Sequence, residues 1–109
     1  MEIVVREYKG VKLLSASGDI DMQSSPALRK ELLALVDLKV PVVIVDFREV
    51  AYIDSSGIAT FVEGLKGMKS YGGKLRLAGI PPRIGEIFNF SKLDKVFSIY
   101  ESVDDALAG

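Results

Sequence analysis

Hydrophobic and polar positions along the chain alternate between strand-like and helix-like patterns. Short apolar runs bounded by turn residues predict strands at residues 3–5, 11–16, 42–47, 74–78 and 97–100. Apolar residues three or four positions apart predict helices over residues 26–37, from the 54–57 turn to about residue 70, in a short stretch opened by residues 81–82, and from residue 102 through residue 107. The resulting order, ββαβαβαβα, predicts an α/β fold in which an N-terminal hairpin joins a mixed, mostly parallel sheet.

Turn and cap residues set the expected ends of these elements. Tyr8-Lys9-Gly10 predicts the tight turn of the hairpin. Ser25 is expected to be the N-cap of the first helix, with Pro26 at its first helical position. Gly72-Gly73 is expected to end the second helix, because glycine readily adopts the positive φ found at helix ends. The unbroken apolar run 42–47 predicts a strand that is buried on both faces or lies in the middle of the sheet.

The segment Asp54-Ser55-Ser56-Gly57 follows this buried strand and opens the second helix. Unpaired N–H groups and the helix dipole favour negative charge at such a position, where Asp54 or Ser55 could serve as the N-cap. The segment fits an ordinary strand-to-helix turn, but a serine here is also well suited to carry a phosphate. Phosphate on Ser55 would add about −1.5 to −2 charges beside Asp54. It would also lie near Asp21 if the acidic loop expected at residues 18–21, after the second strand, shares that end of the sheet. The crowded negative charge would repel an acidic partner or block a close-fitting one, which describes a binding switch that leaves the fold intact.

Composition narrows the possible chemistry. With 109 residues, 49% of them hydrophobic, the chain fits one globular domain. The 14 basic and 15 acidic residues leave a net charge of −1, which argues against nucleic-acid binding. The absence of cysteine and histidine excludes disulfides, thiol nucleophiles, Ser-His-Asp triads and histidine-ligated zinc, so catalysis is not expected. No apolar stretch approaches a membrane span and no secretory signal is evident, which predicts a cytoplasmic protein without a membrane partner.

The chain resembles the STAS domain of the bacterial anti-sigma factor antagonist type. Three segments carry the resemblance: the turn Gly18-Asp19-Ile20-Asp21, the path from Val45-Asp46 to Tyr52-Ile53-Asp54-Ser55-Ser56-Gly57, and the strand entry Gly72-Gly73-Lys74-Leu75. The resemblance covers essentially the whole chain, so residues 1–109 are identified as a single domain of this family. It implies a mixed sheet with helices packed mainly on one face.

The resemblance also implies a role in signal transduction and transcription regulation. In this family the serine that matches Ser55 is phosphorylated, with ATP, by a partner that is both a serine kinase and an anti-sigma factor. The unphosphorylated antagonist binds that partner and releases the sigma factor, and a serine phosphatase resets the switch. The same match implies that Asp21, Asp54, Ser56 and Gly57 contact the kinase. No cofactor or metal is expected in this chain, direct nucleotide binding stays open, and a monomer or weak dimer is expected.

Other functions fit parts of the sequence. A constitutive STAS subunit of a transport complex would bind an ABC-type ATPase through the same face, with phosphorylation dispensable. Asp46, together with Asp19 and Asp21, could imitate the acidic cluster of a receiver domain. The N-terminal hairpin, the missing fifth βα unit and the lack of a strand-end lysine argue against that class. Asp46 is therefore expected to cap loop backbone, and Asp19 and Asp21 are expected to be solvated rather than to hold Mg²⁺.

Small residues form a stripe along the second helix, at positions Gly57, Thr60, Gly64 and Gly67. An interior glycine costs about 1 kcal/mol relative to alanine, so the stripe calls for a structural reason. Close packing against a neighbouring helix and a groove for a partner would both provide one. The other side of this helix is expected to lie in the core, through Ile58, Phe61, Val62, Leu65 and Met68.

Overall fold

Five strands form one mixed sheet whose spatial order follows the sequence, β1-β2-β3-β4-β5. The computed structural model describes residues 1–109. The strands are β1 (Glu2–Tyr8), β2 (Val11–Ile20), β3 (Val42–Ile53), β4 (Lys74–Ala78) and β5 (Ser98–Tyr100). β1 pairs with β2 in the antiparallel sense, and every other neighbouring pair is parallel. The predicted hairpin and mostly parallel sheet are confirmed.

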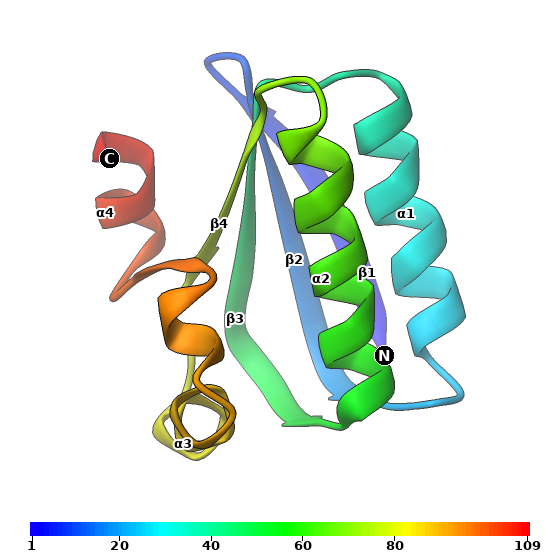
Figure 1. The fold of residues 1–109 in the computed structure, drawn as a ribbon, viewed down its shortest axis with the longest axis vertical. Coiled ribbons are helices and arrows are strands. Elements are labelled where there is room, and N and C mark those ends of the chain that lie inside the picture. The colour runs from blue at the N-terminus through cyan, green and yellow to red at the C-terminus, as the bar shows by residue number, and fades with distance from the viewer.

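The helices lie mainly on one face of this sheet, as the family resemblance implied. They are α1 (Ser25–Asp37), α2 (Ser55–Lys69), α3 (Pro82–Phe90), α4 (Val103–Ala108) and a short 3₁₀ helix, η1 (Leu93–Lys95). Figure 1 shows α1 and α2 side by side along one face, both starting at the end of the sheet where β2 and β3 finish. It shows α4 on the other side of the sheet. No helix is long and apolar enough to cross a membrane.

The central strand β3 is buried on both faces, as its unbroken apolar run predicted. Val43, Val45 and Phe47 point into the main core beneath α1, α2 and α3. Ile44 points the other way and packs with Ala106 of α4, because successive side chains of a strand alternate between faces. Phe47 also lies at the centre of an aromatic cluster, 5.2 Å from the Phe61 ring and 6.1 Å from the Phe88 ring between centroids. The main core therefore ties the sheet to α2 and α3 through this strand.

Three predicted boundaries were wrong. β3 does not end at residue 47 but continues to Ile53, because its second half, which opens with the exposed Arg48 and Glu49, still pairs with β2 beyond the point where β4 has finished. The same pairing draws residues 18–20, which were expected to form a loop, into β2. Helix α1 begins at Ser25, so Ser24 and not Ser25 is its N-cap residue. The Ser25 hydroxyl instead donates to the carbonyl oxygen of Asp21, at 2.6 Å.

The small-residue stripe on α2 is a packing surface between helices and strands. A Cβ on Gly64 would overlap the Cδ2 methyl of Leu32, and a Cβ on Gly67 would lie 2.9 Å from Val36 Cγ1. Both contacts are with α1, so the absent side chains let the two helices approach closely. Gly57 is likewise enclosed by side chains of β2 and β3. The space beside its three glycines is occupied by the chain itself, whereas Thr60 borders a shallow hollow between α1 and α2.

Expected core residues on the other side of α2 divide into two groups. Phe61, Leu65 and Met68 are buried, as predicted. Ile58 and Val62 are only half-buried, although both pack against the main core.

Replacing Gly64 with alanine should destabilise the protein by about 1–3 kcal/mol, because the added methyl group overpacks against the fully buried Leu32. Gly85→Ala is a matched control, since a Cβ there meets only an ordinary contact at 3.8 Å and alanine favours the helix. Chemical denaturation of both variants measures the difference. Equal stability of the two variants would contradict the packing role of Gly64.

Candidate functional site

The Asp54-Ser55-Ser56-Gly57 turn lies at the end of the sheet where β2 and β3 finish and α2 begins. The backbone N–H of Asp54 donates to the carbonyl oxygen of Ile20, at 3.0 Å, so the ends of the two strands are joined at the turn. The loop after β2, which contains Asp21, therefore lies beside the start of α2. The two acidic segments that the sequence suggested as neighbours share one edge of the sheet.

Asp54 is the N-cap of α2, which decides between the two candidate cap residues. One carboxylate oxygen, Oδ1, accepts from the backbone N–H groups of Ser56 at 2.9 Å and Gly57 at 3.2 Å, and also from the Ser56 hydroxyl. The other oxygen, Oδ2, accepts from the N–H of Met22 across the loop, at 3.2 Å. The hydrogen bond from the Ser56 hydroxyl lowers the pKa of Asp54; desolvation opposes this, and the three backbone N–H groups add to the lowering. Asp54 is thus an anion held by two segments far apart in sequence.

Ser56 is committed to this network. Its hydroxyl donates to Asp54 and lies 2.9 Å from the hydroxyl of Ser25 on α1, and it is only half-exposed. The Ser25 hydroxyl in turn donates to the carbonyl oxygen of Asp21. A chain of close polar contacts therefore runs from the N-terminus of α2 through α1 to the loop after β2.

Ser55 differs sharply from its neighbour. It occupies the first position of α2, its side chain is exposed to solvent, and its hydroxyl makes no hydrogen bond within the chain. A serine hydroxyl in this state can be modified without first breaking any contact. Of the two adjacent serines, Ser55 is the more exposed, and its hydroxyl is the one that makes no hydrogen bond within the chain.

Asp21 and Gly57 have internal roles as well. Asp21 Oδ1 accepts from the backbone N–H groups of Gln23 and Ser24, both at 3.0 Å, which shapes the loop before α1. Gly57 is buried, and a Cβ there would lie 2.6 Å from Ile20 Cγ2 and 2.8 Å from Ile53 Cγ1. Its lack of a side chain lets the first turn of α2 sit directly on the ends of β2 and β3.

The turn is flanked by two apolar side chains, and the sequence analysis did not propose either of them as a site residue. Met22 is 76% exposed and Tyr52 is 49% exposed, one in each segment that leads to the turn. Met22 also borders a shallow hollow between the first turns of α1 and α2, which is lined by Met22, Ser25, Pro26, Arg29, Ser56, Ala59, Thr60 and Glu63. The sequence signal that could have indicated this surface was Met22, a single methionine in a polar loop. Its exposure could not be foreseen without the tertiary fold.

The Arg29–Glu63 ion pair joins α1 to α2 at this hollow. Arg29 Nε and Nη2 donate to the two carboxylate oxygens of Glu63, at 2.8 and 2.7 Å. Such a two-bond pair fixes the relative position of both side chains more firmly than a single contact. The hollow is therefore bounded on one side by paired, opposite charges.

Asp46 is a structural residue and lies away from this turn. Burial acts against its ionisation, but the side-chain and backbone hydrogen bonds from Arg48 outweigh burial and hold the pKa of Asp46 below its ordinary value. Asp46 Oδ1 accepts from the Arg48 N–H at 3.0 Å, which agrees with the expected backbone-capping role. Asp19 and Asp21 do not form part of any group of three or more carboxylates or other metal-binding side chains.

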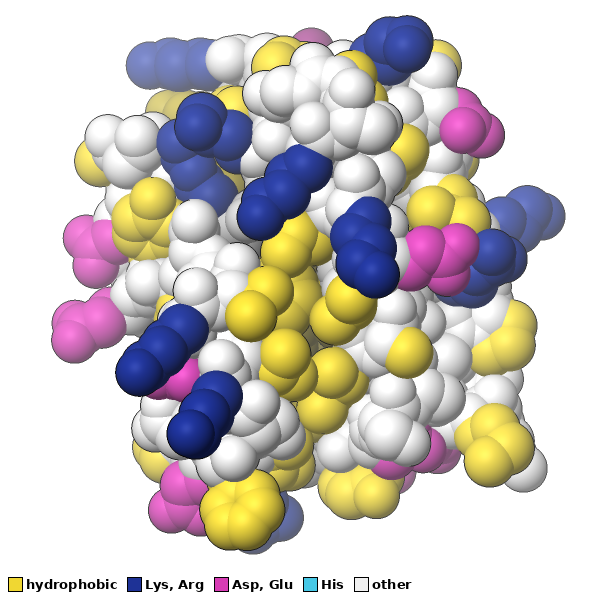
Figure 2. Space-filling view, in the orientation of Figure 1, with side chains coloured by type: hydrophobic (Ala, Val, Ile, Leu, Met, Phe, Trp, Pro, Cys, Tyr) yellow, Lys and Arg dark blue, Asp and Glu magenta, His cyan; other side chains and the backbone are white.

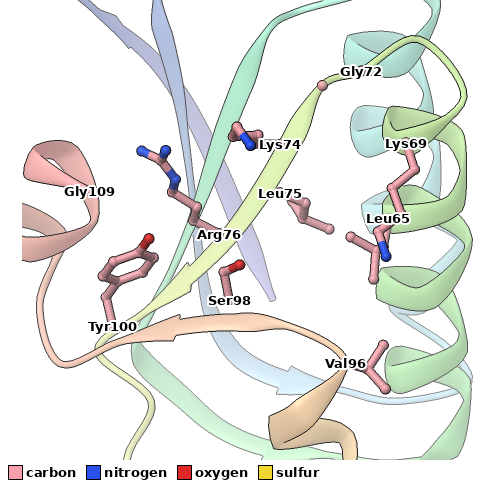
Figure 3. Close-up of a pocket in the computed structure, with 11 residues that line it drawn as sticks. Leu65, Lys69, Gly72, Lys74, Leu75, Arg76, Val96, Ser98, Tyr100 and Gly109 are labelled. Atoms are coloured by element: carbon pink, nitrogen blue, oxygen red, sulfur yellow. The ribbon is translucent and has the colours of Figure 1, made fainter.

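The largest hollow of the molecule lies elsewhere, between the C-terminal end of α2, the starts of β4 and β5, and the end of α4. Figure 2 shows a strip of hydrophobic side chains between α2 and the side formed by α3 and α4, with Lys and Arg side chains around it. Figure 3 shows Lys69, Lys74 and Arg76 around the hollow, and no Asp or Glu side chain lines it. The Arg76 guanidinium already donates to the Ala106 carbonyl oxygen, at 2.9 Å. Helix α2 separates this hollow from Ser55 by about 20 Å, given a rise of about 1.5 Å per residue.

Comparison with known proteins agrees with this arrangement. A family model described as the STAS domain matches residues 2–106. The chain is 31% identical over 99 residues to an anti-sigma-B factor antagonist of Bacillus subtilis (strain 168), a match that covers 91% of this chain and 90% of that protein. Among solved structures, an anti-sigma factor antagonist from Mycobacterium paratuberculosis has a TM-score of 0.91 at 28% identity, covering 98% of this chain and 91% of that one. The phosphorylated form of the Bacillus cell fate determinant SpoIIAA shares the fold, with a TM-score of 0.77 at 16% identity over 98% of this chain and 97% of that one.

Asp54→Asn should make stability less dependent on acid pH. Because the pKa of Asp54 is lowered in the folded protein, its stabilising effect is fully present above the unfolded-state pKa of about 3.9 and is lost as the pH falls through the folded-state pKa. The variant should melt at a lower temperature than the wild type at neutral pH, and the gap should narrow on acidification. Thermal melts of both proteins from neutral pH to acid pH test this expectation. Asp37→Asn, which removes an exposed carboxylate that makes no hydrogen bond, is the control. A constant gap for Asp54→Asn would contradict the assignment.

Proposed function

The chain belongs to the STAS domain family, and from this we propose that it is an anti-sigma factor antagonist whose binding is switched by phosphorylation of Ser55. The observation that carries the proposal is the contrast between the two serines of the turn. Ser55 is exposed and unbonded at the start of α2, whereas Ser56 is held by Asp54 and Ser25. The named relatives favour this function over that of a constitutive subunit of a transport complex.

A phosphate on Ser55 would change the surface without unfolding the helix. The N-terminus of α2 tolerates negative charge because its dipole and free N–H groups interact favourably with an anion. Asp54 already uses the N–H groups of Ser56 and Gly57, so the phosphate would stay on the outside of the turn beside this carboxylate. A charge of about −1.5 to −2 would then be added to an already acidic patch.

The surface around Ser55 has the composition of a protein contact. Exposed Met22 and Tyr52 supply apolar area on either side of it, and the hollow between α1 and α2 offers a recess for a side chain of the partner. Burial of apolar side chains with a polar rim is typical of such interfaces. We propose that Asp21, Asp54 and Ser56 shape this surface and contact the partner at its edge, and that Gly57 supports it from below.

The proposed partner is an anti-sigma factor that is also a serine kinase. ATP would be bound by that kinase, so this chain needs no cofactor and no catalytic group of its own. A serine phosphatase would remove the phosphate and restore binding. The relatives are named as antagonists, a class of binding proteins rather than enzymes.

Ser55→Asp should weaken binding to the cognate anti-sigma factor by more than about tenfold, because like charges facing each other across an interface cost several kcal/mol. Thermal stability should stay close to that of the wild type, since the new carboxylate lies at a helix N-terminus. Isothermal titration calorimetry and thermal melts measure the two effects. Ser70→Asp places the same charge on an exposed serine at the other end of α2 and is the control for the binding measurement; it also removes the hydrogen bond that the Ser70 hydroxyl donates to the Gly67 carbonyl oxygen.

Phosphorylation by the same kinase with ATP should be lost in Ser55→Ala and retained in Ser56→Ala, as measured by intact-mass and fragment mass spectrometry. Phosphate found on Ser56 of the wild type would move the switch to that residue. Wild-type affinity of Ser55→Asp would contradict the switch. Equal binding of an ABC-type ATPase by both forms would support the transport-subunit alternative instead.

A further inference from the structure

Strand β1 forms an exposed edge of the sheet. It pairs with β2 on one side and has no neighbour on the other, and six of its seven residues are exposed. Val4 is 44% and Val5 36% exposed, so the edge is apolar as well as open. An edge strand of this kind presents a row of free N–H and C=O groups that can pair with another strand.

The side chains of β1 are complementary in charge to those of a second, antiparallel β1 strand. Glu7 is paired with Lys12 of β2, at 2.8 Å, whereas Glu2 and Arg6 make no ion pair. Glu2 and Arg6 lie two positions to either side of Val4, on the same face of the sheet as Val4. Ile3 and Val5 lie on the opposite face, where Ile3 packs against the main core.

We propose that β1 pairs with β1 of a second copy of this chain, in the antiparallel sense and centred on Val4. In this register Val4 faces Val4 of the second copy, and Glu2 and Arg6 face each other twice across the symmetry axis. Ile3 faces Val5 on the side of the sheet that carries α1 and α2. The two five-stranded sheets become one continuous sheet of about ten strands, joined by a two-fold interface.

Neighbouring registers are less favourable, which gives the proposal its specificity. Facing side chains must lie on the same face of the sheet, so the nearest alternative registers are shifted by two residues. One of them centres the pair on Val5, with Val4 opposite Arg6 and Ile3 opposite Glu7. Only the register centred on Val4 combines apolar pairs with two pairs of opposite charge, and cross-strand pairs of these kinds stabilise a sheet.

This inference is independent of the proposed function, because it concerns the sheet edge and not the turn at Ser55. A second copy is the occupant that the strand selects, since the two charges on β1 that make no ion pair within the chain, Glu2 and Arg6, find their complements on the same segment. The result would be a concentration-dependent dimer that leaves α1, α2 and the Ser55 turn on each copy uncovered by the new strand pair.

Disulfide cross-linking tests the register directly, because the chain has no native cysteine. Val4→Cys should form an intermolecular disulfide on mild oxidation, since facing residues in antiparallel strands have Cα atoms about 4.5–5.5 Å apart. Val5→Cys is the matched control. Its two copies would be offset by two residues along the strands and lie about 8 Å apart, too far for a disulfide. Non-reducing electrophoresis of both variants gives the result, and a dimer formed by Val5→Cys but not by Val4→Cys would overturn the register.

Charge exchange tests the interface in solution. Arg6→Glu and Glu2→Arg should each weaken self-association by at least about tenfold, because each change turns two opposite-charge pairs into two like-charge pairs. The double variant Glu2→Arg/Arg6→Glu should restore the dimer, and an equimolar mixture of the two single variants should form a heterodimer. Sedimentation velocity over a range of protein concentrations measures these outcomes. A wild-type protein that stays monomeric throughout, or a dimer unaffected by either single change, would overturn the proposal.

Discussion

Asp54 joins three parts of the molecule through its side chain and its backbone. Its carboxylate oxygens accept hydrogen bonds from the first turn of α2 and from Met22 in the loop after β2, while its backbone N–H donates to the carbonyl oxygen of Ile20 at the end of β2. The ends of two strands and the start of a helix are thereby fixed to one another. The apolar core determines the layers of the fold, but this anion determines how the surface around Ser55 is shaped.

The fold was largely predictable because its main signals are local or periodic. The apolar run at residues 42–47 and the helical spacing in α1 and α2 indicated the layers, and glycines marked the end of α2. The sequence could not indicate the full length of β3. Its second half carries exposed polar residues such as Arg48 and Glu49, and it remains a strand only because β2 runs beside it. The pairing partner, rather than the strand's own composition, decides this boundary.

The site was predictable in its location but not in its division of roles. A strand that leads into Asp54-Ser55-Ser56-Gly57 points to a helix N-terminus, and the resemblance to a known family singles out Ser55. That Ser56 also lies against Ser25 depends on the approach of α1, which brings together residues 31 positions apart. The close approach follows in turn from Gly64 and Gly67, whose role was ambiguous in the sequence. The exposure of Met22 likewise depends on tertiary structure.

The unequal surroundings of Ser55 and Ser56 mean that the substrate itself can determine which residue is modified. A kinase that drew Ser56 into its active site would have to break the hydrogen bond from its hydroxyl to Asp54, separate it from Ser25 and distort the first turn of α2. Presenting Ser55 requires none of this. A kinase of the kind proposed would therefore need no fine discrimination between adjacent identical side chains, because the folded chain withholds one of them. The choice between Ser55 and Ser56 would then depend on the folded structure of the target. A change that loosened the turn would make modification of the two serines less selective, without any change in the kinase.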